Sequence, residues 1–395
     1  MIGFDEASAR IAAAAQPLRR ETLPLPQAHG RVLASAVLAQ VDSPPSAVSA
    51  MDGYALRSAD LGAYPLRLRI AGEALAGSPH PGPVEPGSCV RIFTGGQVPA
   101  GADRVVIQER VTRDGETAVI EADPGAARHV RTRGCDFAAG DLLLPAGRLL
   151  DYRALVAAAG ADCDRLELWQ RPRLALLGTG DELVAPGTAR GTPDRIPESV
   201  SFGVLGLARD WGADPVLHRR LPDDLPTLAA AAAEAVDAAD LVVVTGGASA
   251  GDRDFARAMF APLGLERRFD KVAIRPGKPV WFGRVRDTLV LGLPGNPTAA
   301  LLTARLFLAP LLAGLSGRDP AEALRWRPVP LAASLAAGGE RESFVRARWT
   351  GSAAEPLSDQ DAGAQRTLAE ATLLLRRPAG APAAPAGTPV HALDL

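Results

Sequence analysis

The sequence predicts a multidomain α/β protein, in which an open α/β domain is joined to a β-rich insertion domain, a helical linker domain and a small C-terminal β domain. The chain has 395 residues, enough for roughly two to four domains. Residues 172–322 alternate apolar, strand-like runs with amphipathic helices, which is typical of an open α/β sheet. Residues 46–145 contain short β-type runs separated by Gly and Pro turns, which predicts a β-rich domain.

The composition excludes several classes of protein. Apolar residues make up 47% and charged residues 22%, as in chains that form a folded core. The formal net charge of −2 argues against a general nucleic-acid binder. The 3 cysteines and 5 histidines show neither a disulfide framework nor zinc-ligand spacing. The N-terminus does not resemble a signal peptide, and no run approaches the ~18 apolar residues of a membrane span. We therefore expect a cytoplasmic protein without membrane or nucleic-acid partners.

We expect residues 1–45 to be mainly helical, beginning with the amphipathic helix MIGFDEASARIAAAAQ. The β-rich domain (46–145) follows, with the strand-like runs LRLRIAG, CVRIFTGG, RVVIQERV and TAVIEA. The segment LDYRALVAAAGA then has a helical pattern, and residues 146–171 complete the helical linker domain begun by 1–45.

In the α/β domain (172–322), the expected strands are RLALLGTG, PVLHRRL, DLVVVTGG and TLVLGLPGN. The helices expected between and after them are SFGVLGLARDWGA, DDLPTLAAAAAEAVDAA, DFARAMFAPLG and PTAALLTARLFLAPLLAGL. Asn296 is a good N-cap for the last helix, and Pro297 suits its first position. Residues 323–395 return to short strands and form the C-terminal β domain.

Three of these strands end in comparable loops: LALL leads into GTGDE, LVVV into TGGASAGDRD, and LVLG into LPGNP. In an open parallel sheet, ligands bind outside the carboxyl ends of the strands. The glycines allow main-chain N–H groups to approach an anion, and the helix after Asn296 adds its positive end. One such loop alone would be an ordinary turn, but three on one edge predict a ligand site.

The charged residues of these loops indicate which ligand. Asp181, Glu182, Asp252 and Asp254 lie beside the glycines, a combination that suits a phosphorylated ligand with a hard cation such as Mg²⁺. The RPGKP segment (275–279) supplies Arg275 and Lys278, which could neutralise a phosphate or another oxyanion.

A competing motif is present at 247–251, where GASAG matches the G-x-S-x-G nucleophile elbow of α/β-hydrolases. That fold requires a downstream His, and the only later histidine is His391, beside a Pro-rich tail. A serine hydrolase is therefore the weaker alternative.

Seven stretches, in order, resemble the molybdopterin molybdenumtransferase family (MoeA and the gephyrin E domain). They are SAMDGYALR (49–57), VRIFTGGQVPAGADRVVIQE (90–109), GCDFAAGDLLLPAG (134–147), LLGTGDELVAPG (176–187), VVTGGASAGDRDF (243–255), VAIRPGKPVWFG (272–283) and LGLPGNPTAALLT (291–303). The resemblance implies an L-shaped homodimer of four-domain subunits that uses Mg²⁺. It implies insertion of molybdenum from molybdate into adenylylated molybdopterin with release of AMP, and the molybdopterin adenylyltransferase as a further partner.

The resemblance also assigns roles by motif. Asp181 and Glu182 belong to the active-site loop, and Asp52 and Thr94 are expected to face the partner subunit's cleft. The candidate catalytic residues are Asp52, Asp181, Glu182, Asp254 and Lys278, and the candidate metal ligands are Asp181, Glu198 and Asp254. The candidate substrate-binding residues are Thr94, Gly178, Thr179, Gly180, Gly246, Gly247, Ser249, Arg275, Pro279, Pro294, Gly295 and Asn296.

Several positions depart from the family pattern. The usual Asp-Ser-Asn is Glu198, Ser199 and Val200, and the Lys that opens the Pro-Gly-Lys turn is Arg275. A usual Ser after the PGNP motif is Ala299, and the usual Ser-Gly and Ala-Asn are Ala362-Gly363 and Ala371-Thr372. We expect the metal and adenylate side to be intact and the oxyanion side to have lost hydroxyl donors. This leaves open a diverged molybdopterin-binding paralogue that serves as a carrier or maturation scaffold.

Overall fold

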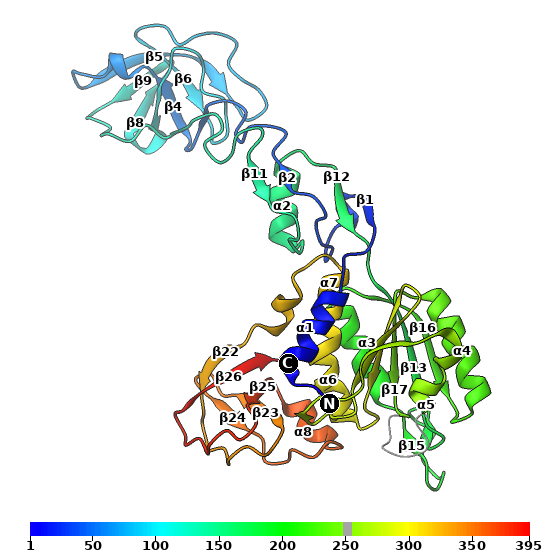
Figure 1. Ribbon diagram of the computed structural model, residues 1–395. Helices are drawn as coiled ribbons and strands as arrows, with labels where there is room; N and C mark the ends of the chain where they lie inside the picture. Colours follow the sequence, from blue (N-terminus) through cyan, green and yellow to red (C-terminus); the bar gives the residue numbers. More distant parts are fainter. Residues whose placement is uncertain (248–254) are drawn as a thin grey trace.

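The computed structural model describes residues 1–247 and 255–395. An arm projects from a two-part body, and both chain termini lie in the body (Figure 1). The far end of the arm is β-rich and the part nearer the body is the linker, while the body contains a large α/β unit beside a smaller β unit (Figure 1). The predicted multidomain α/β fold is confirmed; the exact domain boundaries stay predictions.

The α/β unit is built on a six-stranded sheet in the order β16-β13-β17-β21-β20-β18. Strands β16, β13, β17 and β21 are parallel, whereas β20 and β18 are antiparallel additions that the sequence did not predict. Their bounds are β13 (Arg173–Thr179), β16 (Asp214–Leu221), β17 (Leu241–Thr245), β18 (Glu266–Phe269), β20 (Trp281–Val285) and β21 (Thr288–Leu293). The short strands β14 (Leu183–Val184) and β15 (Ile196–Pro197) pair beyond the sheet.

Side-chain alternation along β13 divides the core into two layers, because successive residues of a strand point to opposite faces. Leu174 and Leu176 pack with the layer that includes residues of α1 and α3, and Ala175 and Leu177 pack with residues of α4. Central strands covered on both faces are continuously apolar, as the sequence of β13, β17 and β21 is. The helices of this unit are α1 (Phe4–Ala14), α3 (Val200–Asp210), α4 (Leu225–Ala238), α5 (Phe255–Ala258), η4 (Ala261–Leu263), α6 (Pro297–Thr303), the π-helical η5 (Ala304–Leu308) and α7 (Ala309–Leu315).

The consecutive helices α6, η5 and α7 form one long apolar segment. By length and composition, Pro297–Leu315 is long and apolar enough to cross a membrane. Its apolar sequence is interrupted by the polar residues Thr298, Thr303 and Arg305. Because 89% of the apolar window is buried inside the protein, the segment has the burial of a core helix.

The far end of the arm contains a six-stranded sheet in the order β7-β4-β6-β5-β9-β8. Its strands are β4 (Gly53–Leu56), β5 (Leu66–Ala74), β6 (Ser88–Ile92), β7 (Arg104–Ile107), β8 (Val111–Asp114) and β9 (Thr117–Ile120), with β3 (Val48–Ser49) pairing β10 (Val130–Arg131) and the short helices η2 (Ser58–Asp60) and η3 (Gln108–Arg110). The sheet buries small apolar clusters on its faces, as the short strand-like runs predicted.

The linker contains less helix than we expected. Residues 1–45 hold one α-helix, α1, and this packs in the core of the α/β unit. Prolines at 24 and 26 oppose helix continuation, and strands form instead by pairing with distant segments. These are β1 (Arg20–Pro24) with β12 (Arg165–Trp169) and β2 (Val37–Leu38) with β11 (Leu142–Leu144), next to η1 (Leu25–Gln27) and α2 (Tyr152–Gly160).

The smaller unit of the body is a β-sheet in the order β19-β23-β25-β26-β22, with β24 paired to β23. Its elements are β19 (Ile274–Arg275), β22 (Arg327–Pro330), β23 (Glu342–Trp349), β24 (Ala354–Pro356), β25 (Leu373–Arg377), β26 (Pro389–Asp394), α8 (Gln365–Glu370) and η6 (Pro320–Leu324). Strand β19 comes from the RPGKP region, so this segment joins the two units of the body.

Candidate functional site

A cleft of about 640 Å³ lies at the carboxyl ends of β13, β17 and β21. The three loops that the sequence singled out therefore meet, as parallel strand ends in an open sheet should. Ten predicted site residues line the cleft: Thr179, Gly180, Glu182, Glu198, Gly246, Gly247, Pro279, Pro294, Gly295 and Asn296. Gly178 is buried within β13, and Ser249 and Asp254 lie outside the described residues.

Glycines are required where these strand ends approach one another. Gly246 has φ +86°, and a Cβ there would lie 2.4 Å from the carbonyl oxygen of Thr179. At Gly180, with φ +147°, a Cβ would lie 2.8 Å from Oε2 of Glu182. The first glycine lets the β17 loop cross the end of β13, and the second lets the Glu182 carboxylate lie close against the backbone.

The acidic residues have different environments. Asp181 and Glu182 are both exposed, but only Glu182 lines the cleft. Oδ1 of Asp181 accepts a hydrogen bond from the backbone N–H of Asp223 at 3.1 Å. Glu198 is only 5% exposed, and its Oε1 accepts from the backbone N–H of Ser201 at 2.7 Å, so it also caps the start of α3.

Carboxylates from three loops, Glu182, Glu198 and Asp223, contribute to the cleft lining. Oxygen donors of this kind suit Mg²⁺, which usually takes one or two carboxylates together with substrate phosphates. Within residues 1–247 and 255–395, no group of three His, Cys, Asp or Glu side chains is close enough to hold a metal by itself. The donor chemistry thus fits a cation shared with a ligand, and the metal set Asp181, Glu198 and Asp254 stays a prediction.

The RPGKP turn reaches the cleft through Pro279, whereas its two cations, Arg275 and Lys278, do not line it. Gly277 has φ +103°, and a Cβ there would lie 2.2 Å from Cγ2 of Thr303, so the turn sits directly on α6. Pro279 lines the cleft, while Arg275 and Lys278 are exposed. In the part of the chain that the structure describes, neither cation forms an ion pair, so both remain available to an anion.

The smaller unit of the body closes one side of the cleft. The N–H of Thr298 donates to Ala362 O at 3.0 Å, and its hydroxyl donates to Ala364 O at 3.1 Å. Gln365 follows and lines the cleft. Ala299 is 3% exposed and does not line it, so the expected loss of a hydroxyl at this position does not change the cleft surface directly.

A buried arginine fixes the loop at residues 359–364, which we call the covering loop because it lies against the start of α6. Arg346 is fully buried, and its Nη2 donates to Asp359 O at 2.8 Å and to Asp361 O at 3.0 Å. The Gln360 side chain accepts from the Arg346 N–H and donates to its carbonyl. Burial lowers the pKa of the Arg346 guanidinium. This side chain therefore holds the loop from the interior.

Sequence reasoning missed several lining residues. Thr245 immediately precedes the predicted Gly246, and Asp223 follows β16, the fourth parallel strand, so the strand-end pattern could have found both. Gln365 lies on a short helix of another unit, and nothing in the local sequence distinguishes it.

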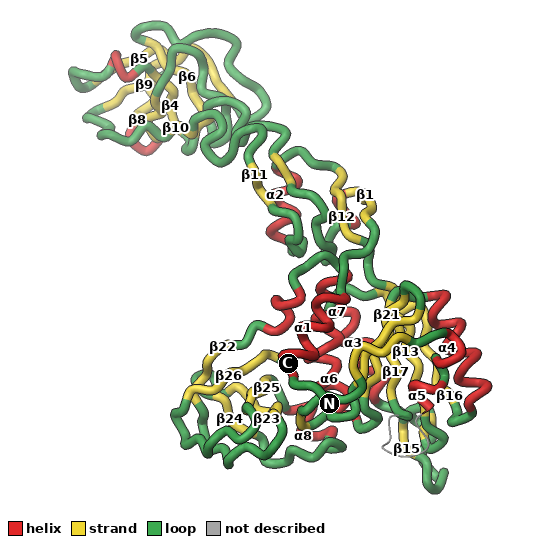
Figure 2. The backbone as a smooth tube through the Cα atoms, viewed as in Figure 1, coloured by secondary structure: helices red, strands yellow, loops and turns green. Residues whose placement is uncertain are grey.

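Asp52 and Thr94 are brought together, but on the arm. Asp52 Oδ1 accepts from the N–H of Thr94 at 2.7 Å and from its hydroxyl at 2.8 Å. The backbone hydrogen bond from Thr94, then its hydroxyl, and also the charge of Arg91 hold the pKa of Asp52 below its usual value. The strands β4 and β6, which border these residues, lie at the end of the arm far from the body (Figure 2). Within one chain the pair does not join the cleft.

Arg91 braces the same arm tip. Its Nη1 donates to Gly53 O at 3.0 Å and its Nη2 to Gln108 Oε1 at 2.6 Å. The N–H of Gln108 in turn donates to Asp52 O at 3.0 Å. Arg91 thus holds both Gly53, the residue after Asp52, and Gln108, the residue that donates to the Asp52 carbonyl.

Comparisons with known proteins agree along nearly the whole chain. Family models match as the MoeA N-terminal region (domain I and II) at residues 2–161, a probable molybdopterin binding domain at 175–314 and the MoeA C-terminal region (domain IV) at 328–395. The molybdopterin molybdenumtransferase of Nostoc sp. is 34% identical over 82% of this chain and 76% of that protein. The molybdopterin molybdenumtransferase of Synechococcus elongatus is 33% identical over 96% of this chain and 95% of that one. A molybdopterin biosynthesis moeA protein from Pyrococcus horikoshii OT3 has the same fold, with a TM-score of 0.86 at 23% identity and full coverage of both chains.

Proposed function

Because the chain belongs to the molybdopterin molybdenumtransferase (MoeA) family, we propose that it inserts molybdenum from molybdate into adenylylated molybdopterin and releases AMP. The observation that carries this proposal is the cleft at the ends of β13, β17 and β21. It combines glycine-rich backbone and carboxylates inside the segment that matches the probable molybdopterin binding domain.

In this reaction the backbone of Gly246, Gly247 and Gly295 would approach the phosphates of the substrate, where no side chain stands in the way. When bound, Mg²⁺ would neutralise charge on the phosphoanhydride and favour its cleavage. The predicted metal ligands Asp181, Glu198 and Asp254 would hold the cation together with the cleft carboxylate Glu182. Of these, Asp254 lies outside the described residues. Arg275 and Lys278 would hold molybdate next to the substrate by charge, which supplies proximity for the transfer.

We extend the proposal to a homodimer. Asp52 and Thr94 form a pre-arranged pair on the arm, away from the cleft of their own chain. A partner's arm would bring the pair to the cleft. The linker offers an apolar surface for such contact, because Leu142, Tyr152 and Val156 are 61%, 71% and 72% exposed. The proposal also includes a cytoplasmic location and the molybdopterin adenylyltransferase as supplier of the substrate.

The two alternatives are not favoured. For a hydrolase, His391 would have to reach the motif serine, but it lies in β26 paired with β22 and β25 and does not line the cleft. A carrier without transferase activity has no support in the comparisons, because the curated relatives are named as molybdenumtransferases.

The direct test follows AMP release from adenylylated molybdopterin in the presence of Mg²⁺ and molybdate. The wild-type chain is compared with Glu182→Gln, which changes a cleft carboxylate, and with Glu234→Gln, which changes an exposed carboxylate on α4 paired with Arg219. We expect at least about a hundredfold slower AMP release for Glu182→Gln, since metal-assisted charge stabilisation is worth several kcal/mol. Glu234→Gln should keep the wild-type rate. Molybdate-independent release, or none from the wild type, would count against the proposal.

A further inference from the structure

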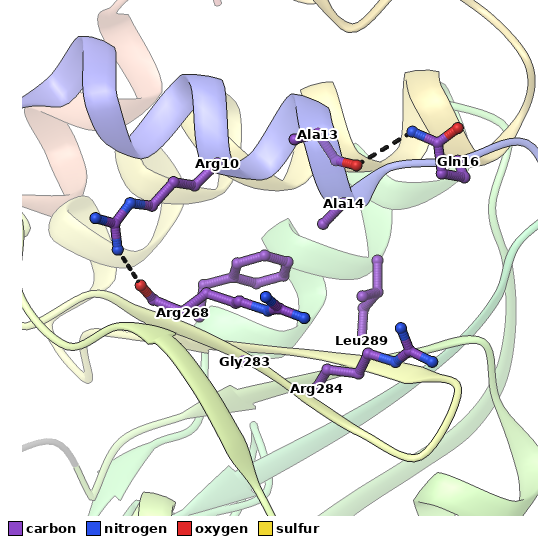
Figure 3. Close-up of a pocket in the computed structure, with 9 residues that line it drawn as sticks. Arg10, Ala13, Ala14, Gln16, Arg268, Gly283, Arg284 and Leu289 are labelled. Atoms are coloured by element: carbon purple, nitrogen blue, oxygen red, sulfur yellow. Dashed lines mark hydrogen bonds between the residues drawn. The ribbon is translucent and has the colours of Figure 1, made fainter.

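A second hollow, of about 420 Å³, lies between α1 and the strands β18, β20 and β21. It shares no lining residue with the strand-end cleft. Figure 3 shows the hollow below the helix, with Arg10 coming from the helix side and Arg268 and Arg284 from the sheet side. We call it the arginine pocket, and neither the sequence motifs nor the proposed reaction uses it.

All charged residues that line the arginine pocket are arginines: Arg10, Arg268 and Arg284. Their acidic partners stand outside the lining: Glu6 is 2.6 Å from Arg10, Asp287 is 2.8 Å from Arg284, and Glu266 is 3.7 Å from Arg268. Arg10 also donates to the backbone carbonyl of Arg268, a contact drawn as a dashed line in Figure 3.

These contacts orient the guanidinium groups without using all their donors. A guanidinium has five N–H donors in a planar fork. The Arg284 side chain donates through Nε to Arg286 O and through Nη2 to Asp287, so Nη1 is not engaged by any residue in 1–247 or 255–395. Arg268 has only the 3.7 Å ion pair with Glu266 within the same ranges. Guanidinium groups arranged in this way suit a phosphate oxygen cluster, which they bind through paired hydrogen bonds.

The rest of the lining is largely apolar. Ala13 and Ala14 contribute from the end of α1, and Phe282 and Leu289 from the sheet. Leu289 extends from the sheet toward Ala14, and the Gln16 amide turns away to Ala13 O at 3.1 Å (Figure 3). An apolar floor with cations on both walls favours a ligand that has an anionic end and a ring system.

We propose that the arginine pocket binds a phosphate monoester carrying a compact ring system, of the class of a nucleoside monophosphate. Its volume of about 420 Å³ lies within the ~300–1,000 Å³ of small-ligand sites. The phosphate lies between Arg268 and Arg284, with Arg10 closing the helix side, and the ring contacts the apolar floor.

The test titrates the full-length protein with AMP, inorganic phosphate and adenosine by isothermal calorimetry at constant ionic strength. The double variant Arg268→Ser with Arg284→Ser removes both sheet-side cations. The matched control is Arg267→Ser, which lies next in β18 but is paired with Asp270 and does not line the pocket. We expect the double variant to bind AMP at least about tenfold more weakly, whereas the control stays like wild type. Adenosine should not bind there, and phosphate should bind more weakly than AMP.

A second variant, Ala13→Trp, protects the test against a folding defect. Ala13 is exposed on α1 and lines the pocket, so the larger ring fills the hollow while every arginine remains. It should weaken AMP binding as the double variant does, with an unchanged melting temperature. The strand-end cleft is unchanged in these variants, so any AMP binding there should persist. Only the AMP binding that the variants lose is assigned to the arginine pocket.

Identical AMP titrations for wild type, the double variant and Ala13→Trp would overturn the proposal. AMP binding no tighter than inorganic phosphate would overturn the ring-bearing ligand. Neither result depends on molybdenum insertion, so failure of the proposed function would leave the arginine pocket intact, and the reverse holds as well.

Discussion

The arm tip and the strand-end cleft hold their carboxylates in opposite ways. At the arm tip, Asp52 accepts two hydrogen bonds from Thr94, and Arg91 ties down the neighbouring backbone. In the cleft, the Glu182 side chain has no hydrogen-bond partner within the described residues. Within the same residues, Arg275 and Lys278 of the adjoining RPGKP turn form no ion pairs. The carboxylate of the arm tip is therefore fully positioned before any ligand arrives, whereas the Glu182 carboxylate of the cleft remains available to one.

The largest effect that tests this contrast concerns the cleft backbone. Gly246→Ala would place a Cβ 2.4 Å from Thr179 O at φ +86°, whereas Gly187→Ala meets the similar φ of +89° with nothing within 4 Å. We expect the first change to cost on the order of 3 kcal/mol and to abolish AMP release, and the second about 1 kcal/mol, from backbone strain alone. Scanning calorimetry and the AMP assay measure both. Equal melting temperatures for the two variants would show that the crossing strand ends relax.

The next effect asks whether the arm tip acts on a partner's cleft. Asp52→Asn and Glu182→Gln should each be nearly inactive as pure proteins. When the two are denatured together and refolded, half of the dimers are mixed. In each mixed dimer one cleft has an intact Glu182 and receives an intact Asp52 from its partner, so about a quarter of the wild-type activity should return. Light scattering should also find dimers. A stable, active monomer, or a mixture as inactive as its components, contradicts the shared site.

A smaller effect concerns the ionisation of Asp52. Thr94→Val removes the hydroxyl hydrogen bond but keeps the backbone one, so the pKa of Asp52 should rise toward its ordinary value of 3.8 without reaching it. Because the folded pKa is depressed, the stabilisation from these bonds is present above the unfolded pKa and is lost as the pH falls through the folded pKa. Titration of the Asp52 carboxyl carbon by NMR measures the shift. An unchanged titration in Thr94→Val would mean that the hydroxyl does not act on this carboxylate.

The smallest effect is expected where the sequence suggested a lost hydroxyl. Ala299 is 3% exposed and absent from the cleft lining. We therefore expect Ala299→Ser to change the molybdate concentration at half-saturation by less than about threefold, which corresponds to less free energy than one typical hydrogen bond contributes. Ala362→Ser, in the covering loop, serves as the comparison. A tenfold gain from Ala299→Ser alone would show that molybdate reaches deeper than the cleft surface.

The sequence predicted the cleft because its signal is local. Each of β13, β17 and β21 contains an apolar run that leads into a glycine-containing loop, and parallel order brings such strand ends together without further information. The sequence did not predict the covering loop. Arg346 holds this loop through the backbone carbonyls of Asp359 and Asp361. Because every residue has such a carbonyl, the sequence does not show which residues accept these hydrogen bonds.

The linker shows the same limit for secondary structure. Arg20–Pro24 pairs with Arg165–Trp169, more than a hundred residues later in the chain. A strand of this kind is stabilised by its distant partner, so its own sequence has little periodicity to reveal it. The antiparallel β18 and β20 were missed for a related reason: they are short, and β18 is an edge strand rich in charge.

The pairing of β1 with β12 has a geometric consequence. The chain leaves the body and returns to it through two adjacent antiparallel strands, so the arm is a closed excursion with a single root. In the proposed dimer, the length of the arm, from its root to Asp52 at its tip, would therefore set the separation of the two clefts. Lengthening or shortening the excursion would change this spacing while the fold of each body stays the same.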